Sequence, residues 1–183
     1  MKSLRASASL LVVALLAWSA RATTFVETGL VPLARAANLV VTGEIDACTS
    51  QVVGAERARI VTFCTLMVDV ARPPTKGALT DDERAKGALT LAVPGGTHGA
   101  LAQRVFGAPR FTTGDRVLVL LGPSNGPGGA RGVVGLAHGV RAVDASGHLT
   151  TAPAFAGTDS HAPPAFDDVA TLDALALALE GGP

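Results

Sequence analysis

The stretch GAPRFTTGDRVLVLL, at residues 107–121, organises the whole chain. Its first half is a turn rich in Gly, Pro and Thr, and its second half is the unbroken aliphatic run at 117–121. The run is too short for a helix, and it has a turn signal at each end, at Gly114-Asp115 and at Gly122-Pro123. It therefore predicts a strand that is buried on both faces.

Two further strands are predicted upstream of this run. Residues 39–47 alternate, with Leu39, Val41 and Ile45 on one face and polar side chains on the other, which is typical of a half-buried strand. Residues 60–70 are rich in β-branched side chains and end before Pro73-Pro74. A polar turn at 54–57 joins the two runs, so together they predict a long hairpin.

The remaining elements are shorter. Further strands are predicted at 88–93, 132–136 and 140–143, and short helices at 26–38 and 166–180, the second capped by Asp167 or Asp168. The repeated KGALT, at 76–80 and 86–90, indicates a lengthened loop with a solvated charged tip at 81–84, because two copies are too few for a solenoid. The pattern predicts a mainly β chain, a small barrel or sandwich of five to seven short strands with a short helix at each end.

The first 22 residues have the features of an export signal. Lys2 and Arg5 precede an apolar core, and Ala20 and Ala22 form an A-x-A cleavage site. We therefore expect cleavage after Ala22 and a periplasmic or secreted chain without a transmembrane segment. The expected organisation is a β domain at 23–150, a linker rich in Pro, Ala and Gly at 151–165, and the last helix.

Charge and aromatic content exclude some partners. Removal of residues 1–22, with three basic and no acidic residues, leaves 12 Lys and Arg against 15 Asp and Glu, a net charge of −3. Trp18 is the only Trp and leaves with the signal, and the chain has no Tyr. An acidic chain with few aromatic side chains is not expected to bind nucleic acid.

The order of strands and turns carries a resemblance. It consists of ANLVVTGEI from residue 37, IVTFCTLMVDV from 60 followed by Lys76-Gly77, LTLAVPGG from 89, GDRVLVLLG from 114 and GVVGLAHGVRAV from 132. This order resembles a group of uncharacterised exported bacterial proteins and, more distantly, the netrin-like OB barrel of tissue inhibitors of metalloproteinases. The resemblance covers most of residues 37–143 and implies a small OB-like barrel.

The chain departs from those inhibitors at its start. They insert an N-terminal Cys, held by a disulfide, into the metal site of a protease. Here the expected mature chain begins with Thr23-Thr24-Phe25, and its first cysteine is Cys48. That inhibitory mechanism therefore does not carry over to this chain.

Cys48 and Cys64 lie near facing ends of the predicted hairpin, in a chain expected to reach an oxidising compartment, so a disulfide is predicted. Alternation opposes this pairing, because Cys48 shares the outward face with Glu44 and Asp46, whereas Cys64 shares the inward face with Leu66. A β-bulge between the two faces would reconcile them. The alternatives are two free thiols, one of them buried, and a catalytic thiol.

Catalytic motifs are sparse. The four histidines lie in different predicted loops without metal-ligand spacing, and no serine stands in a G-x-S-x-G turn. The glycine-rich segment at 122–132 lacks the Lys-Ser/Thr pair of a phosphate-binding loop. We therefore expect no catalytic residues, no metal site and no cofactor. Asp115 and Arg116 are interpreted as a turn cap and an edge charge.

Two loops are the predicted binding surface, because small barrels often bind through the loops between strands. They span 94–98 and 107–113, and their candidate residues are Gly95, Gly96, His98, Pro109, Arg110 and Phe111. Phe106 and Phe111, beside the second loop, are predicted to be core residues. The leading hypothesis is an exported, non-enzymatic module that binds another exported protein, with a secreted protease as one candidate. The alternatives are a hydrolase or metal-dependent enzyme and a carrier of a small ligand in the barrel interior.

Overall fold

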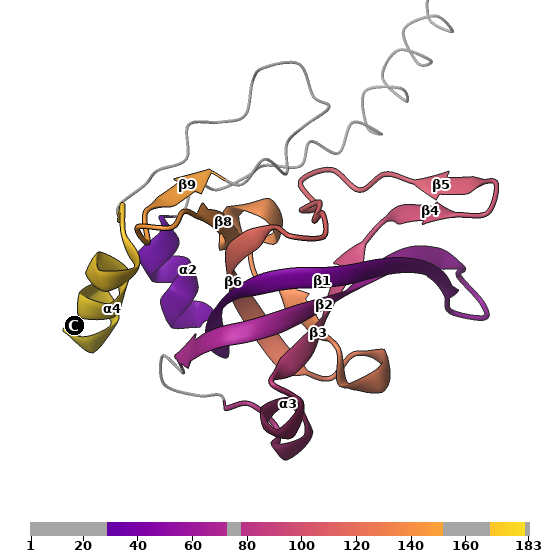
Figure 1. The fold of residues 1–183 in the computed structure, drawn as a ribbon. Coiled ribbons are helices and arrows are strands. Elements are labelled where there is room, and N and C mark those ends of the chain that lie inside the picture. Colours follow the sequence, from indigo (N-terminus) through magenta and orange to yellow (C-terminus); the bar gives the residue numbers. More distant parts are fainter. Residues whose placement is uncertain (1–28, 73–77, 152–168, 182–183) are drawn as a thin grey trace, which may run out of the picture.

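The structure is a computed structural model that describes residues 29–72, 78–151 and 169–181 (Figure 1). The predicted signal peptide, with Ala20 and Ala22 at its cleavage site, lies outside the described residues. The same holds for residues 152–165 of the predicted linker and for the predicted helix caps Asp167 and Asp168.

A closed barrel of five strands forms the centre of the molecule. Its strands are β1 (Leu39–Val53), β2 (Arg59–Arg72), β3 (Ala88–Pro94), β6 (Arg116–Ser124) and β7 (Arg131–Val133). Their order is β1-β2-β3-β7-β6, and the pairing of β1 with β6 closes the ring. Only β3 and β7 pair in parallel among these neighbours. This is the topology of an OB-type barrel, so the predicted fold class is confirmed.

The strand β6 contains the aliphatic run from which the fold was predicted, and both of its faces are buried. Val117, Val119 and Leu121 belong to the core inside the barrel. Leu118 and Leu120 belong to a second apolar cluster outside it. None of the five is more than 3% exposed. A strand with apolar neighbours on both faces has no polar face, which explains why this run does not alternate.

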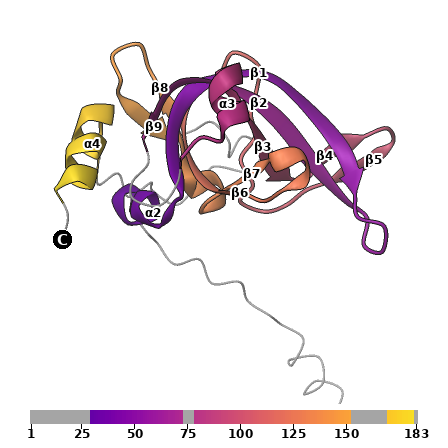
Figure 2. The same cartoon turned by 90° about the horizontal axis from the view of Figure 1, so that it is seen from below.

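Two helices cover the outer cluster. They are α2 (Leu30–Ala36) and α4 (Leu172–Glu180), which lie side by side at one end of the barrel in Figure 2, and Arg35 Nη2 donates to Ala178 O at 3.0 Å. Next to β6, β8 (Val140–Val143) and β9 (Leu149–Thr151) extend the sheet. The N-cap of α4 is Thr171, whose Oγ1 accepts from Ala174 N at 3.2 Å, so this helix begins later than predicted.

The strand β1 bends so that it can pair with β2 on one edge and β6 on the other. Gly43 lies where this bend brings the strands closest. Its Cα faces the backbone carbonyl of Met67 on β2, and any Cβ would collide with that carbonyl. Glycine is therefore required here by the approach of a neighbouring backbone.

The segment at 81–84 is predicted as a solvated loop tip, and Asp81, Asp82 and Arg84 are exposed, but the prediction is wrong for the backbone and for Glu83. The segment begins the helix α3 (Asp81–Lys86), which Thr80 starts with a capping box. Its Glu83 is only 7% exposed and forms a bidentate ion pair with Arg131 of β7, in which Nε donates to Oε1 at 2.7 Å and Nη2 to Oε2 at 2.9 Å. The prediction failed because the partner cation lies 48 residues away.

Between β3 and β6 the chain forms a small hairpin. Its strands β4 (Gly96–His98) and β5 (Leu101–Gln103) pair with each other and lie beside the long β1–β2 hairpin (Figure 1). The short 3-10 helices η1 (Pro127–Gly129) and η2 (Leu136–Gly139) flank β7, so the strand predicted at 132–136 is shorter than expected.

Candidate functional site

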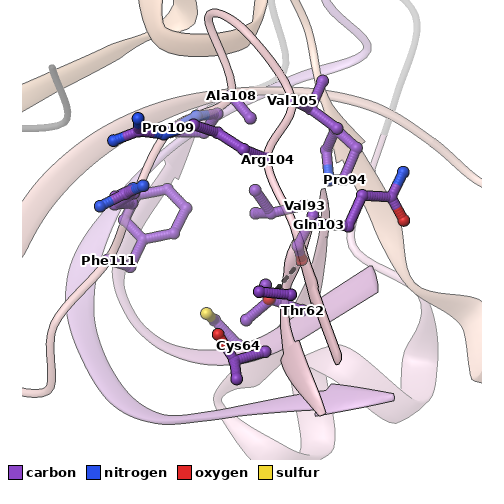
Figure 3. A pocket seen from close by; sticks show the side chains of 15 residues that line it. Thr62, Cys64, Val93, Pro94, Gln103, Arg104, Val105, Ala108, Pro109 and Phe111 are labelled. Carbon is purple, nitrogen blue, oxygen red and sulfur yellow. Dashed lines mark hydrogen bonds between the residues drawn. The ribbon is translucent and has the colours of Figure 1, made fainter. Parts of the chain in front are cut away.

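A cavity of about 540 Å³ opens between the β4–β5 hairpin and the segment that leads into β6 (Figure 3). Its base contains Thr62 and Cys64 of β2. Val93 and Pro94 at the end of β3 line one side, and Phe111 lies opposite them (Figure 3). The cavity thus joins segments that are about 50 residues apart in the chain.

The hairpin wall is fixed to the barrel by hydrogen bonds. Gly95 N donates to Ile60 O at 2.8 Å, and Ile60 N donates to Gln103 Oε1 at 2.6 Å. Thr62 Oγ1 donates to Gly95 O at 2.7 Å. Gly96 has φ of 133° and lies against the hydroxyls of Ser50 and Thr62, where a Cβ would not fit. These contacts hold the wall in a defined position, as a preformed site requires.

The opposite wall is the turn at 107–111 that precedes β6. Gly107 O accepts from Ala137 N at 2.9 Å, and the turn ends where Thr112 N donates to Asp115 Oδ2 at 2.7 Å. Asp115 is therefore a turn cap, as interpreted from the sequence. Pro109 is buried and Phe111 is half-buried against the barrel core. This wall therefore has an apolar, well-packed surface.

The predicted disulfide between Cys48 and Cys64 is confirmed, and the free-thiol and catalytic-thiol alternatives are wrong. The two residues are direct partners across β1 and β2, with their Cα atoms 4.1 Å apart. Ile45 pairs with Leu66 and Ala47 with Thr65, so Asp46 is the extra residue of a β-bulge. This bulge turns Cys48 inward and resolves the conflict in alternation.

Among the described residues that line the cavity, Arg104 and Arg110 are the charged ones, and none is acidic. Both arginines are exposed. Arg104 follows β5, and in Figure 3 its side chain extends towards Pro109 on the other wall. The described charged side chains of the lining are therefore both basic.

Two large apolar side chains are exposed on the segment that forms the cavity walls. Leu101, on β5, is 62% exposed, and Phe106, just before the second wall, is 69% exposed. The prediction that Phe106 is a core residue is therefore wrong. Phe111 does pack on the core, but it also lines the cavity.

The structure brings most of the predicted binding residues together. Gly95, Gly96, Pro109, Arg110 and Phe111 all line this one cavity. His98 does not line it. It lies exposed at the end of β4, where its ring Nδ1 lies 2.9 Å from Ser50 O, a geometry in which Nδ1–H donates to the carbonyl.

The prediction overlooked Thr62, Val93, Gln103 and Arg104 as lining residues. Thr62 and Val93 were assigned to strands, and nothing local marks a strand end as a cavity wall. Gln103 and Arg104 could have been found from Gly99-Ala100, a two-residue turn between β4 and β5 in which Gly99 has φ of 59°. A two-residue connection beginning with Gly is a hairpin signal.

The other titratable groups are dispersed. Within the described ranges, no group of three or more His, Cys, Asp and Glu side chains is placed to hold a metal ion. Asp144 closes an exposed turn, and the Ser146 hydroxyl, which donates to it at 2.7 Å, holds its pKa below the usual 3.8. Its backbone hydrogen bonds from Ser146 and His148 give it a structural role in that turn.

The fold and the site define a class: an OB-type barrel with a preformed cavity beside one hairpin. Comparison of the chain with protein-family models, curated proteins and solved structures finds no match. In the part of the chain that the structure describes, no helix is both long enough and apolar enough to cross a membrane.

Proposed function

We propose that this chain is an exported, non-enzymatic module that binds an extended segment of another protein in the cavity between the β4–β5 hairpin and the turn at 107–111. The observation that carries this proposal is the position of Leu101 and Phe106, two exposed apolar side chains on the segment that forms the cavity walls. Exposed apolar surface that is continuous with a pocket marks an interaction site, and both side chains lie on the chain segment that supplies lining residues of the cavity. A segment anchored in the cavity would cover them as it continues along the hairpin.

The cavity has the anatomy of an anchor site. Cys64 at its base and Val93 and Phe111 on its two sides are apolar, and its polar groups include those of the backbone, Thr62 and Gln103. Protein interfaces obtain most of their binding free energy from a few side chains buried in such pockets, with surrounding contacts that exclude water. Leu101 and Phe106 would provide those surrounding contacts.

Export is part of the proposal. The basic and apolar pattern of residues 1–22 supports it, and so does the Cys48–Cys64 disulfide, because such bonds persist in oxidising compartments. The resemblance to metalloproteinase inhibitors makes a secreted protease one candidate partner. Inhibition of a panel of secreted proteases by the mature chain tests that part separately.

Exchanging the exposed apolar side chains is expected to weaken binding without changing the fold. A displayed peptide library is selected on the immobilised chain 23–183, and the selected peptide is measured by calorimetry. We expect Phe106→Ser and Leu101→Ser each to weaken its binding about tenfold, or about 1.4 kcal/mol. Leu177→Ser is the matched control, because Leu177 is 69% exposed but lies on α4, away from the cavity. Equal affinities for all three variants would contradict the proposal.

The size of the cavity favours a second candidate, a carrier of a small organic ligand. Its volume of about 540 Å³ falls within the range of about 300–1,000 Å³ that is usual for ligand sites. The barrel interior is filled by the apolar core, so the ligand would lie in this cavity. Native mass spectrometry of the protein purified from its source tests this function. A carrier is expected to retain a bound small molecule, and the bare mass of the chain would oppose it.

A further inference from the structure

We infer that the tip of the β1–β2 hairpin is a cleavage site for an arginine-specific endoprotease, which cuts between Arg57 and Ala58. The tip comprises residues 54–58, and every one of them is exposed. It lies beyond the last paired position of the hairpin, Val53 with Arg59, at the end of the molecule opposite to α2 and α4 (Figures 1 and 2). Exposed loop tips with small and polar residues are preferred sites of proteolytic cleavage.

The backbone of the tip can open at a low free energy. Residues 54–58 bend back without a helix, a strand or a hydrogen-bonded turn, and Gly54 has φ of 89°, which starts the reversal of the chain. A protease reaches a peptide bond in a folded protein when the segment around it opens locally. Segments with few buried contacts open most often, and the ends of a strand ladder fray first.

Hydrogen bonds at Ile60 limit how far the hairpin opens. Ile60 is only 6% exposed. Its N–H donates to Gln103 Oε1 at 2.6 Å, and its carbonyl accepts from Gly95 N at 2.8 Å. Opening of the last pair of the hairpin therefore frees residues 53–59 and stops at Ile60.

These limits select one of the two arginines at the tip. Endoproteases of the trypsin class bind Arg in a pocket that contains a carboxylate. The bond after Arg57 has free residues on both sides, whereas the bond after Arg59 joins it directly to Ile60, which is held. The remaining Lys and Arg residues of the described chain lie on a helix or a strand or in the walls of the cavity.

The disulfide decides what the cut produces. One water molecule is taken up: it adds to the carbonyl carbon of Arg57, the bond to Ala58 N breaks, and a new carboxylate and a new amino group remain. Because Cys48 and Cys64 lie on opposite sides of this bond, the two products stay joined. The described lining residues of the cavity all lie within 62–111, on the second product. The cut protein is therefore a two-chain molecule that keeps these residues on one chain.

Limited digestion of the chain 23–183 with trypsin tests the inference. We expect a first product with the mass of the intact chain plus one water, which separates into 23–57 and 58–183 only on reduction. Arg57→Gln should slow this first cut about tenfold or more, because it removes the recognised side chain. Arg59→Gln is the matched control and should leave the rate unchanged. In the chain denatured with urea, both bonds should be cut.

Three outcomes would contradict the inference. Cleavage of the native chain after Arg59 as readily as after Arg57 would overturn the selectivity attributed to Ile60. A first cut elsewhere, with products that separate without reduction, would overturn the site itself. So would a native chain that stays intact under conditions that digest the denatured chain. The digestion requires no ligand in the cavity, so the proposed binding function is tested separately.

Discussion

Replacing Arg131 by methionine is expected to lower the free energy of unfolding by about 3–5 kcal/mol, because it leaves the Glu83 carboxylate buried without its partner. Arg131 is 3% exposed, and its guanidinium makes four hydrogen bonds. Two of them go to Glu83, and the other two go to the carbonyls of Ala78 and Gly122, at 3.0 and 3.2 Å. The Arg131 side chain thus connects β7 to α3, to the segment at Ala78 that precedes α3, and to β6. Urea unfolding at neutral pH measures the loss.

Two variants control this prediction. Arg84→Met breaks the exposed pair with Asp81 on the same helix, where the two side chains are 61% and 101% exposed, and should cost no more than about 1 kcal/mol. The double variant Arg131→Met/Glu83→Leu removes both buried charges and should recover much of the loss. A cost for Arg131→Met no larger than that for Arg84→Met would contradict a structural role for the buried pair.

The same pair predicts a dependence of stability on pH. The hydrogen bonds from Arg131 hold the pKa of Glu83 below its ordinary value of 4.5, against the opposing effect of burial, and Thr80 N adds a further hydrogen bond. A carboxylate with a lowered pKa stabilises the folded state above its unfolded pKa, and this contribution is lost as the pH falls through the folded value. Stability should therefore decrease below about pH 4.5. The decrease should be shallower in Glu83→Gln, and unfolding curves between pH 7 and 3 measure it.

Removing the disulfide is expected to cost about 3 kcal/mol, the second-largest effect. Cys48 and Cys64 are 16 residues apart, and a cross-link that closes a loop of about this length restricts the unfolded chain by that amount. The variant Cys48→Ala/Cys64→Ala and the reduced wild-type chain should lose similar stability in urea unfolding. If oxidised and reduced chains unfold at the same urea concentration, the bond does not contribute as argued.

Loss of the disulfide should also weaken binding in the cavity. Cys64 lies at the base of the cavity, two residues from Thr62. The Thr62 hydroxyl is hydrogen-bonded to Gly95 O, in the cavity wall, and to the Ser50 hydroxyl, which supports it. We expect the selected peptide to bind the reduced chain more weakly than the oxidised chain, which calorimetry measures. Reduction should also increase amide exchange more in β4 and β5 than in α4, which packs on the outer apolar cluster.

Local patterns in the sequence were sufficient wherever a segment's neighbours in the chain are also its neighbours in space. The aliphatic run at 117–121 could be recognised as a strand covered on both faces, and the runs at 39–47 and 60–70 as a hairpin. The disulfide could be predicted for the same reason. Cys48 and Cys64 fall on opposite faces of the predicted strands, so their pairing required a β-bulge, and the structure places that bulge at Asp46.

The errors lie where distant segments meet. Glu83 looked like a solvated charge because its partner, Arg131, lies on another strand, and Phe106 looked like a core residue because its exposure depends on where the β4–β5 hairpin lies. The binding loops could be proposed from turn residues. The sequence could not show that Gly95 and Phe111 line the same cavity, or that Thr62 and Val93 line it with them.

By itself, therefore, the amino-acid sequence determined the main strands, the long hairpin and the disulfide, because apolar periodicity and turn residues act over a few positions, and it left a barrel and a sandwich open. Only the tertiary structure decided the closure of β1 on β6, the burial of the Glu83–Arg131 pair and the meeting of two loops around a cavity that carries Arg104 and Arg110. These features arise when the chain closes into a ring, which brings together groups whose separation along the sequence leaves no periodic signal.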